Sequence, residues 1–455
     1  MRRGKFLVVL FVFCLAPLVY SQTEPRLLGF DGFMKQVIAS HPLSNQANLR
    51  LSTQRLVQMQ ARGAMDPKLS SSFSEKQFGG NQYYQYFNSS IKIPTPLGIS
   101  VVGGYEQTGG IYLNPESLTD DLGLWYTGIE LDVLRGFRIN ERSVGLRKAD
   151  IQSNLLGFEA EQLRNQLQWQ AGNAYLNWQE YFWIDAILRN GQELAEQYHQ
   201  NTKLAFLNGE KTALDTLEAF ILAQDALAAV QANSVSLEKY VRALNTFIWS
   251  DTSGNLGYYP DTLNNSSLLP FENIGIANNP ALQLNRGKIE LIEQDQRLYK
   301  EALKPALKLK YNPLLATSNE SIMPVFAPSN YKWGVDLAFP VFWRKERAKL
   351  QMNQIKLKEN KYALDLKQVQ LENKLSASMI NIGTLQDQLE VVAANVDRYQ
   401  RLLEGETIRF DLGESSVFLL NKRQEKYMES RIKQIKSIIA LRRERLYLNY
   451  LTNNF

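Results

Sequence analysis

Hydrophobic and polar positions change their spacing several times along this chain, and the same order of changes occurs twice. A stretch of helical period begins at Pro42 and ends before Pro67, and another begins at Pro280 and ends before Pro305. The two pairs of prolines share one offset of 238 positions (280 − 42 and 305 − 67). Each helical stretch is followed by alternation with period two and then by a very long helical stretch. A repeat of this size indicates a duplicated unit that sets the architecture.

Alternation with period two predicts strands over about 69–134 in the first copy and about 306–342 in the second. Tyrosine and tryptophan recur in these stretches, as is typical of barrel strands near a lipid–water boundary, although an ordinary soluble sheet would give the same alternation. The prolines of the segment from Pro313 to Pro328 predict that it forms a loop. The first copy holds more strand-like sequence than two strands require. We expect the surplus, about 96–121, to form an extracellular or barrel-rim extension.

The longest helical stretches are free of proline from about Glu141 to Phe206 and from Arg344 to Phe410. Some 65 helical residues span roughly 95 Å, whereas helices of globular proteins average three or four turns. Each stretch ends at a glycine turn, at Gly209 or Gly413, and returning helices are expected at about 212–248 and 415–452. Such helices form antiparallel coiled-coil hairpins. The second long helix carries a heptad stripe at Leu371, Leu375, Ile382, Leu385, Leu389, Val392, Val396, Tyr399 and Leu403, and the first a partial one at Leu167, Ala171, Ala174, Trp178 and Tyr181.

The N-terminal residues predict a signal peptide over 1–21, with three basic residues before an apolar run that contains the only cysteine, Cys14. Its removal would lower the formal charge from +5 to +2 and leave no thiol, disulfide or cysteine-ligated metal. A near-neutral mature chain gives no reason to expect nucleic acid as a partner. No later segment has 18 consecutive apolar residues, so a membrane-crossing form of this chain would need a closed β-barrel.

These features together resemble the outer-membrane efflux protein (TolC) family over nearly all of the mature chain. The resemblance rests on the repeated order of helix, strand pair, long helix, glycine turn and helix. Four local motifs add to it: Leu131–Phe137, Leu337–Phe342, Gly209–Thr212 with Asp215, Leu217 and Ala219, and Gly413–Ser416 with Leu420 and Gln424. The expected division is a first repeat over 22–250, a linker over 251–275 and a second repeat over 276–455. The expected fold is mainly α with a β-barrel part.

The resemblance implies a homotrimer in which each chain gives four strands to one 12-stranded barrel and its helices to a periplasmic tunnel. It implies a place in the outer membrane of a Gram-negative bacterium, in contact with lipid. The function implied is a passive exit duct of a tripartite efflux system, served by a periplasmic adaptor and an inner-membrane pump. A duct for type I protein secretion would use the same tunnel. A periplasmic coiled-coil scaffold without a pore is a more distant alternative.

The two glycine turns are the first candidate site, because the family's turns form the inner end of the tunnel where the adaptor docks. The positions implied as adaptor contacts are Phe206, Gly209, Thr212, Phe410, Gly413 and Ser416. Glycine permits the reversal and the hydroxyl at the third following position can cap the returning helix. The same residues could serve only to make the turn.

A gate is the second candidate site. Some family members carry carboxylates six and nine residues beyond the second glycine, where this chain has Leu419 and Lys422. Acidic residues stand instead at the first-copy equivalents, Asp215 and Glu218. Three copies would triple whichever charges face the lumen and so alter ion selectivity. Alternatively, acids at a helix start complement the helix dipole.

No catalytic constellation, phosphate loop, dinucleotide fingerprint or metal-ligand spacing occurs, so we expect no enzyme, cofactor or metal site. The two histidines, His41 and His199, are expected to be ordinary surface or interface residues. An aromatic group crowds the first long helix: Trp169, Trp178, Tyr181, Phe182 and Trp183. Helix packing explains this group better than a ligand-stacking site.

Overall fold

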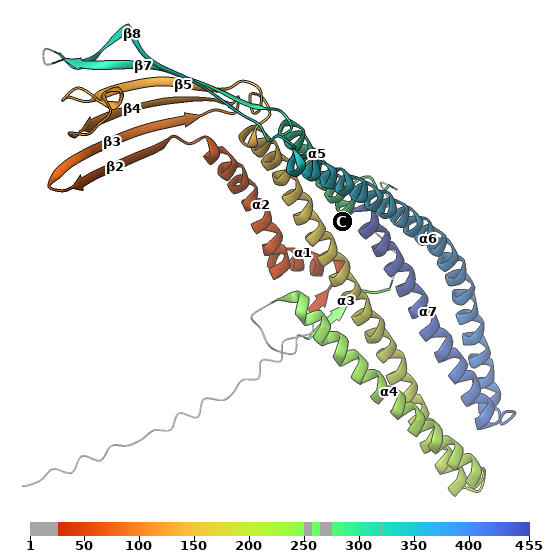
Figure 1. Cartoon of the computed structure of the whole chain (residues 1–455). Helices are drawn as coiled ribbons and strands as arrows, with labels where there is room; N and C mark the ends of the chain where they lie inside the picture. The colour runs from red at the N-terminus through yellow and green to blue at the C-terminus, as the bar shows by residue number, and fades with distance from the viewer. Residues whose placement is uncertain (1–25, 250–256, 264–274, 319–320) are drawn as a thin grey trace, which may run out of the picture.

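The computed structural model describes residues 26–249, 257–263, 275–318 and 321–455. The expected signal peptide, with Cys14, and most of the expected linker lie outside the described residues. One sheet stands at one end of a long layer of helices, so the mainly α fold with a sheet part is confirmed (Figure 1). No helix in the described ranges is long and apolar enough to cross a membrane.

The helices occur as two matching sets. The first copy has α1 (Phe30–Ser40), α2 (Pro42–Arg62), α3 (Glu141–Leu207) and α4 (Ala213–Ile248). The second has α5 (Pro280–Glu301), α6 (Arg344–Asp411) and α7 (Val417–Thr452). Helices α3 and α6 are 67 and 68 residues long, and α4 and α7 have 36 residues each. The duplication therefore extends to the lengths of the paired helices, with α3 and α6 reaching about 100 Å, whereas α1 has no counterpart among the described residues of the second copy.

Four helices lie abreast at each level of the layer. Near the sheet the order of neighbours is α2, α3, α5 and α6, whereas farther away it is α4, α3, α7 and α6. The heptad stripes are buried between these neighbours: Leu371 and Ile382 of α6 pack against Leu451 and Leu441 of α7. The coiled-coil interpretation of the long helices is thereby confirmed.

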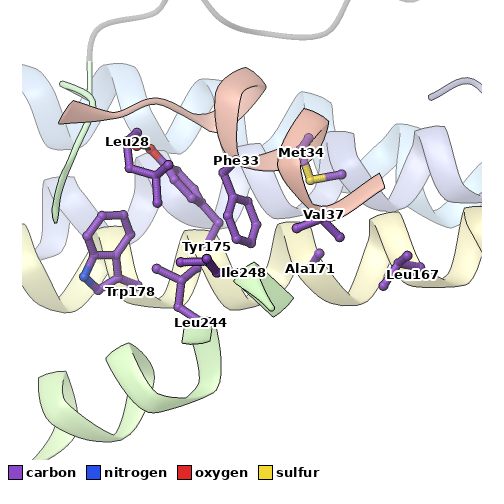
Figure 2. Close-up of a cluster of buried hydrophobic side chains, with 10 residues drawn as sticks. All are labelled: Leu28, Phe33, Met34, Val37, Leu167, Ala171, Tyr175, Trp178, Leu244 and Ile248. Atoms are coloured by element: carbon purple, nitrogen blue, oxygen red, sulfur yellow. Dashed lines mark hydrogen bonds between the residues drawn. The ribbon is translucent and has the colours of Figure 1, made fainter. Parts of the chain in front are cut away.

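The main buried cluster lies where α1 and the end of α4 meet the middle of α3 (Figure 2). Tyr175 is fully buried there, and its single hydroxyl hydrogen has two acceptors within reach, Oδ1 of Asp261 at 2.7 Å and the carbonyl of Leu28 at 2.8 Å. Burial and the Asp261 carboxylate raise the pKa of Tyr175, so its hydroxyl stays protonated. Two short strands, β1 (Arg26–Leu28) and β6 (Tyr258–Pro260), pair in parallel beside this cluster. The cluster thus joins the start of the chain to the segment between the repeats.

The aromatic group on α3 serves helix packing, as expected. Trp178 belongs to the main buried cluster, Trp169 stacks on Tyr450 of α7, and Tyr181 contacts Tyr240 of α4. Of the histidines, His41 is buried rather than exposed. Its Nδ1 accepts from the Leu43 amide at 3.1 Å and so caps α2. Burial lowers the pKa of His41, which keeps this nitrogen free to accept.

The sheet differs from the expectation. Within the described residues it has six antiparallel strands in the order β2 (Lys68–Phe78), β3 (Asn81–Pro94), β4 (Ile99–Gly109), β5 (Leu124–Asp132), β7 (Ala306–Ser318) and β8 (Ser321–Ala338). The implied number of four strands per chain is therefore wrong. The expectation that 96–121 forms an extracellular or barrel-rim extension is also wrong for 99–109, because β4 pairs with both β3 and β5 within the sheet.

The expected loop from Pro313 to Pro328 is wrong as well, since β7 continues to Ser318 and β8 begins at Ser321. A register shift between Pro313 and Leu315 accommodates the first proline. Pro328 lies in β8 between Phe326 and Tyr331, where the pairing with β7 is interrupted, so its missing amide hydrogen breaks no bond of that ladder.

Directly paired residues in an antiparallel sheet share a face, so the register defines two faces. Large exposed apolar side chains from all six strands share the apolar face, namely Leu69, Phe73, Ile91, Val101, Ile129, Leu309, Tyr311, Trp333, Val335 and Leu337. The polar face carries Lys68, Ser70, Ser72, Asn88, Lys92, Glu106, Glu130, Lys308, Lys310, Lys332 and Asp336. Lys92 pairs with Glu130 across β4, and Lys310 with Asp336 at 2.8 Å. One face therefore suits an apolar surrounding and the other suits water.

Close approach of α3 and α7 depends on Gly172. A Cβ atom added there would lie 2.5 Å from Cδ2 of Leu446. We expect Gly172→Val to destabilise the protein by about 1–3 kcal/mol through overpacking, seen as a lower melting temperature. Gly145→Val is the matched control in the same helix, because a Cβ at Gly145 meets nothing within 4 Å. Equal melting temperatures of the two variants would contradict the close approach.

Candidate functional site

The first glycine turn joins α3 to α4. Helix α3 ends at Leu207, and Gly209 adopts a φ of 76°, a left-handed conformation that favours glycine. Thr212 Oγ1 then accepts from the Asp215 amide at 3.2 Å, while the Asp215 carboxylate accepts from the Thr212 amide at 2.9 Å. This reciprocal capping box begins α4.

The second turn repeats this geometry between α6 and α7. Gly413 has a φ of 78°, and its amide donates to the Phe410 carbonyl at 3.0 Å, as Gly209 donates to Phe206 at 3.0 Å. Ser416 caps α7 by accepting from the Leu419 amide at 3.3 Å. The turn-forming roles expected of the glycines and hydroxyls are confirmed in both copies.

The paired phenylalanines have different surroundings. Phe206 is 42% exposed, whereas the Phe410 ring is half-buried and lies 6.5 Å from the Tyr198 ring of α3. The Nζ atom of Lys211, in the first turn, lies 5.2 Å from the centre of the Phe410 ring. The second phenylalanine therefore holds the two turns of one chain together, which leaves the first one available at the surface.

Both turns are surrounded by exposed apolar side chains. We call these the tip apolar set: Leu204, Phe206, Leu207, Leu214, Leu217 and Ile221 from the first hairpin, and Ile408, Leu412, Phe418 and Leu419 from the second. Each of these side chains is more than 40% exposed in the single chain. A cluster of this kind at the end of a long helical layer is typical of a surface that contacts another protein.

The expected gate residues lie on the first turns of α4 and α7. Asp215 serves as a capping acid, and hydrogen bonds from the Thr212 backbone and hydroxyl hold its pKa below the ordinary value. Glu218 lies one turn farther along α4 and is partly exposed. In the other hairpin Leu419 is 41% exposed, and Lys422 forms an ion pair with Glu425 at 2.6 Å. The helix-start interpretation of Asp215 thus has direct support, and its carboxylate remains ionised.

The sequence analysis missed a buried carboxylate at the second turn. Glu406 is almost fully buried and accepts from the Ser415 hydroxyl at 2.6 Å, with Arg423 at 3.5 Å and Arg409 at 4.0 Å. The Ser415 hydrogen bond, together with the two arginines, lowers the pKa of Glu406. Glu406 stands in a long polar helix, and nothing in the sequence around it marks it as buried.

A small cavity of about 220 Å³ lies between α3, α4 and α7, in the part of the helical layer near the tips. Gly191, Ala195 and Met428 line it, and Asn421 and Gln424 lie buried at its edge with polar atoms that lack a partner in the single chain. In the described part of the chain no group of three or more acidic, histidine or cysteine residues is placed to hold a metal ion.

No family model and no curated protein matches this sequence. Several solved structures match its fold at low sequence identity. A membrane protein from Pseudomonas aeruginosa aligns with a TM-score of 0.68 at 15% identity, over 93% of this chain and 90% of its own. The Campylobacter jejuni CmeC outer membrane channel aligns with a TM-score of 0.67 at 11% identity, over 93% and 85%. The outer membrane protein VceC from Vibrio cholerae aligns with a TM-score of 0.66 at 13% identity, over 93% and 94%.

These alignments cover both copies of the repeat, with the helical layer and the sheet together. They agree with the order of elements on which the resemblance of the sequence rests. The chain has the fold of the TolC-like outer-membrane channels.

Proposed function

We propose that this chain is the outer-membrane duct of an export system, passing water-soluble cargo outward without chemistry of its own. The observation that carries the proposal is the two-faced sheet standing on a layer of helices about 100 Å long. An apolar face over six strands suits lipid, and the charged opposite face suits a water-filled lumen. The channels with this fold, such as CmeC, are described as outer membrane channels, which supports the same conclusion.

The two edge strands support assembly from several copies. Strands β2 and β8 each have one unpaired edge, and six strands are too few to enclose a water-filled pore. Closure by further copies of the chain removes both edges. We propose a homotrimer in the outer membrane of a Gram-negative bacterium, with its helices extending into the periplasm.

The tips are proposed to dock on a periplasmic adaptor that belongs to an inner-membrane pump. The tip apolar set lies about 100 Å from the sheet and so faces away from the membrane. Phe206, Gly209, Thr212, Phe410, Gly413 and Ser416 shape this surface. Among export systems we propose tripartite efflux of small molecules. Cross-linking in cells, followed by identification of the pump recovered with the protein, tests this choice. A pump for small molecules would support efflux, whereas an ATP-driven exporter with a polypeptide cargo would indicate secretion.

Membrane fractionation and planar-bilayer conductance test the duct itself. We expect the protein in the outer-membrane fraction and discrete single-channel conductance steps from the purified protein. Recovery in the soluble periplasmic fraction without conductance would overturn the proposal in favour of a scaffold.

We propose that Asp215 and Glu218, rather than Leu419 and Lys422, supply the charges of the gate. Loss of three ionised carboxylates should weaken block by divalent cations, so Asp215→Ala should raise the half-blocking Mg²⁺ concentration by about three- to tenfold. Single-channel recordings at several Mg²⁺ concentrations measure this shift.

Thr212→Ala is the matched control for the gate, because it removes the cap of α4 and retains the carboxylate. An equal shift in Thr212→Ala would assign the effect to the helix start rather than to charge in the lumen.

A further inference from the structure

The first copy of the repeat contains an additional hairpin in its sheet. Helix α3 begins 74 positions after Pro67, whereas α6 begins only 39 positions after the equivalent Pro305. The difference of 35 positions is enough for two strands with their connections. Accordingly the first copy gives four strands to the sheet and the second gives two.

The additional strands are part of one continuous sheet. The full length of β4 is paired, from Ile99 with Leu131 to Gly109 with Gln85. The ion pair of Lys92 on β3 with Glu130 on β5 spans β4 on the polar face. Neither β3 nor β4 can leave the sheet without breaking ladders on both of its sides.

The inner strands also have the same two faces as the outer ones. On β3 the exposed Ile91 lies on the apolar face and the neighbouring Ser90 on the polar face. On β4, Val101 lies on the apolar face and Glu106 on the polar face, where it accepts from Asn88 at 3.1 Å. A hairpin that filled the lumen or projected into water would expose such an apolar face to water, which is unfavourable.

The strand directions permit closure by identical copies. Strands alternate in direction along the sheet, so the edge strands β2 and β8 run in opposite directions. Strand β8 of one copy can therefore pair antiparallel with β2 of the next. An even number of strands per copy is the condition for this, and six satisfies it.

We propose that three copies of this chain close an 18-stranded barrel, wider than a 12-stranded one, with β3 and β4 as wall strands. Six strands from each of three copies make eighteen. With strands about 4.8 Å apart and tilted by about 40°, eighteen strands give a backbone diameter of about 36 Å, against about 24 Å for twelve. This inference rests on the proposed function, because it assumes the trimeric duct.

The helical layer favours the wider barrel. Four helices per copy lie abreast beside the sheet, so three copies place twelve helices in the wall of the tunnel. Twelve helices about 8–10 Å apart have a circumference of about 95–120 Å. Eighteen strands have a circumference of about 113 Å, and twelve only about 75 Å. The tunnel thus continues into the membrane without narrowing, and the barrel admits any cargo that the tunnel can carry.

Electron cryomicroscopy of the protein purified in detergent tests the inference directly. We expect three copies and eighteen wall strands, with a backbone diameter of about 36 Å. A barrel of twelve strands with β3 and β4 outside the wall, or two copies closing twelve strands, would overturn it. Neither result would contradict the proposed duct function, provided that the protein fractionates with the outer membrane and conducts ions.

Cysteine labelling provides an independent test in membranes. Ser90→Cys and Ile91→Cys are neighbours on β3 that differ only in the face they occupy. We expect a membrane-impermeant maleimide to label Ser90→Cys at least about tenfold faster, because a thiol facing lipid ionises poorly and is shielded from water. Equal labelling of the two positions would place β3 outside the wall and overturn the proposal.

Discussion

Replacing Leu214 and Leu412 together with aspartate is expected to abolish docking of the adaptor while leaving the duct assembled. The two side chains are 77% and 70% exposed in the single chain, one on each hairpin beside the glycine turns. Buried apolar anchors carry most of the energy of an interface, at about 1–2 kcal/mol or more each. Loss of both should therefore lower adaptor affinity by about 30- to 1,000-fold.

The measurement is cross-linking of the adaptor in cells, together with export by the intact system. Replacing the same two leucines with methionine is the matched control, since it keeps apolar contact at both positions. Conductance and melting temperature of the purified aspartate variant should remain unchanged. Undiminished cross-linking of that variant would show that the tip apolar set lies outside the adaptor interface.

Truncating Tyr175 to alanine is expected to have the largest effect on stability, at about 3–5 kcal/mol. The side chain is fully buried between α1 and α3 (Figure 2). Its hydroxyl lies within hydrogen-bond distance of Asp261 and of the Leu28 carbonyl. The cavity would form where the start of the chain and the segment between the repeats meet α3. Thermal melting and limited proteolysis of the N-terminal helices measure the loss.

Tyr175→Phe separates the hydroxyl from the ring. We expect a loss of about 1–3 kcal/mol, because the buried acceptors around this hydroxyl, Oδ1 of Asp261 and the Leu28 carbonyl, lose the one donor that they share. Since burial and Asp261 raise the pKa of Tyr175 above its ordinary value of 10.0, this tyrosine stabilises the fold fully below pH 10 and progressively less as the pH rises further. The difference in melting temperature between the wild type and Tyr175→Phe should therefore shrink above pH 10. A constant difference would contradict the role assigned to the hydroxyl.

The helices could be predicted from the sequence because their signals are local. Proline-free stretches fix where α3 and α6 run, and Gly209 and Gly413 fix where they reverse. The caps at Thr212 and Ser416 follow from the same few residues. The structure bears out these assignments since each depends on the backbone of one turn.

The sheet was harder to predict because its signals depend on neighbouring strands. The sequence of β4 is strand-like, but it exceeds the two strands expected of the first copy and is therefore assigned to an extension. Strand β4 also contains Gly103 and Gly104, a residue type that lowers strand propensity. A Cβ at Gly104 would lie 2.5 Å from Cζ of Tyr126, so the glycine makes room for a ring on β5. Nothing within β4 itself could reveal that requirement.

The buried Glu406 could not be predicted for a similar reason. Its partners include Arg423, which lies 17 positions away on the returning helix. A carboxylate in a long polar helix normally faces water. Ser415 and Arg423 reach the Glu406 carboxylate only because the turn between α6 and α7 has this length.

The pairing of β1 with β6 has a consequence for the order in which the protein can be built. Arg26 pairs with Tyr258, 232 positions later in the chain, and Asp261 follows immediately. On the proposed route, the chain enters the periplasm from its N-terminus, so β1 arrives first and waits for the whole first repeat before its partner strand follows. The N-terminal segment would then be an unpaired strand during export, when such edges attract chaperones or other chains. On the same route, the main buried cluster would be completed only after the first repeat has crossed the inner membrane.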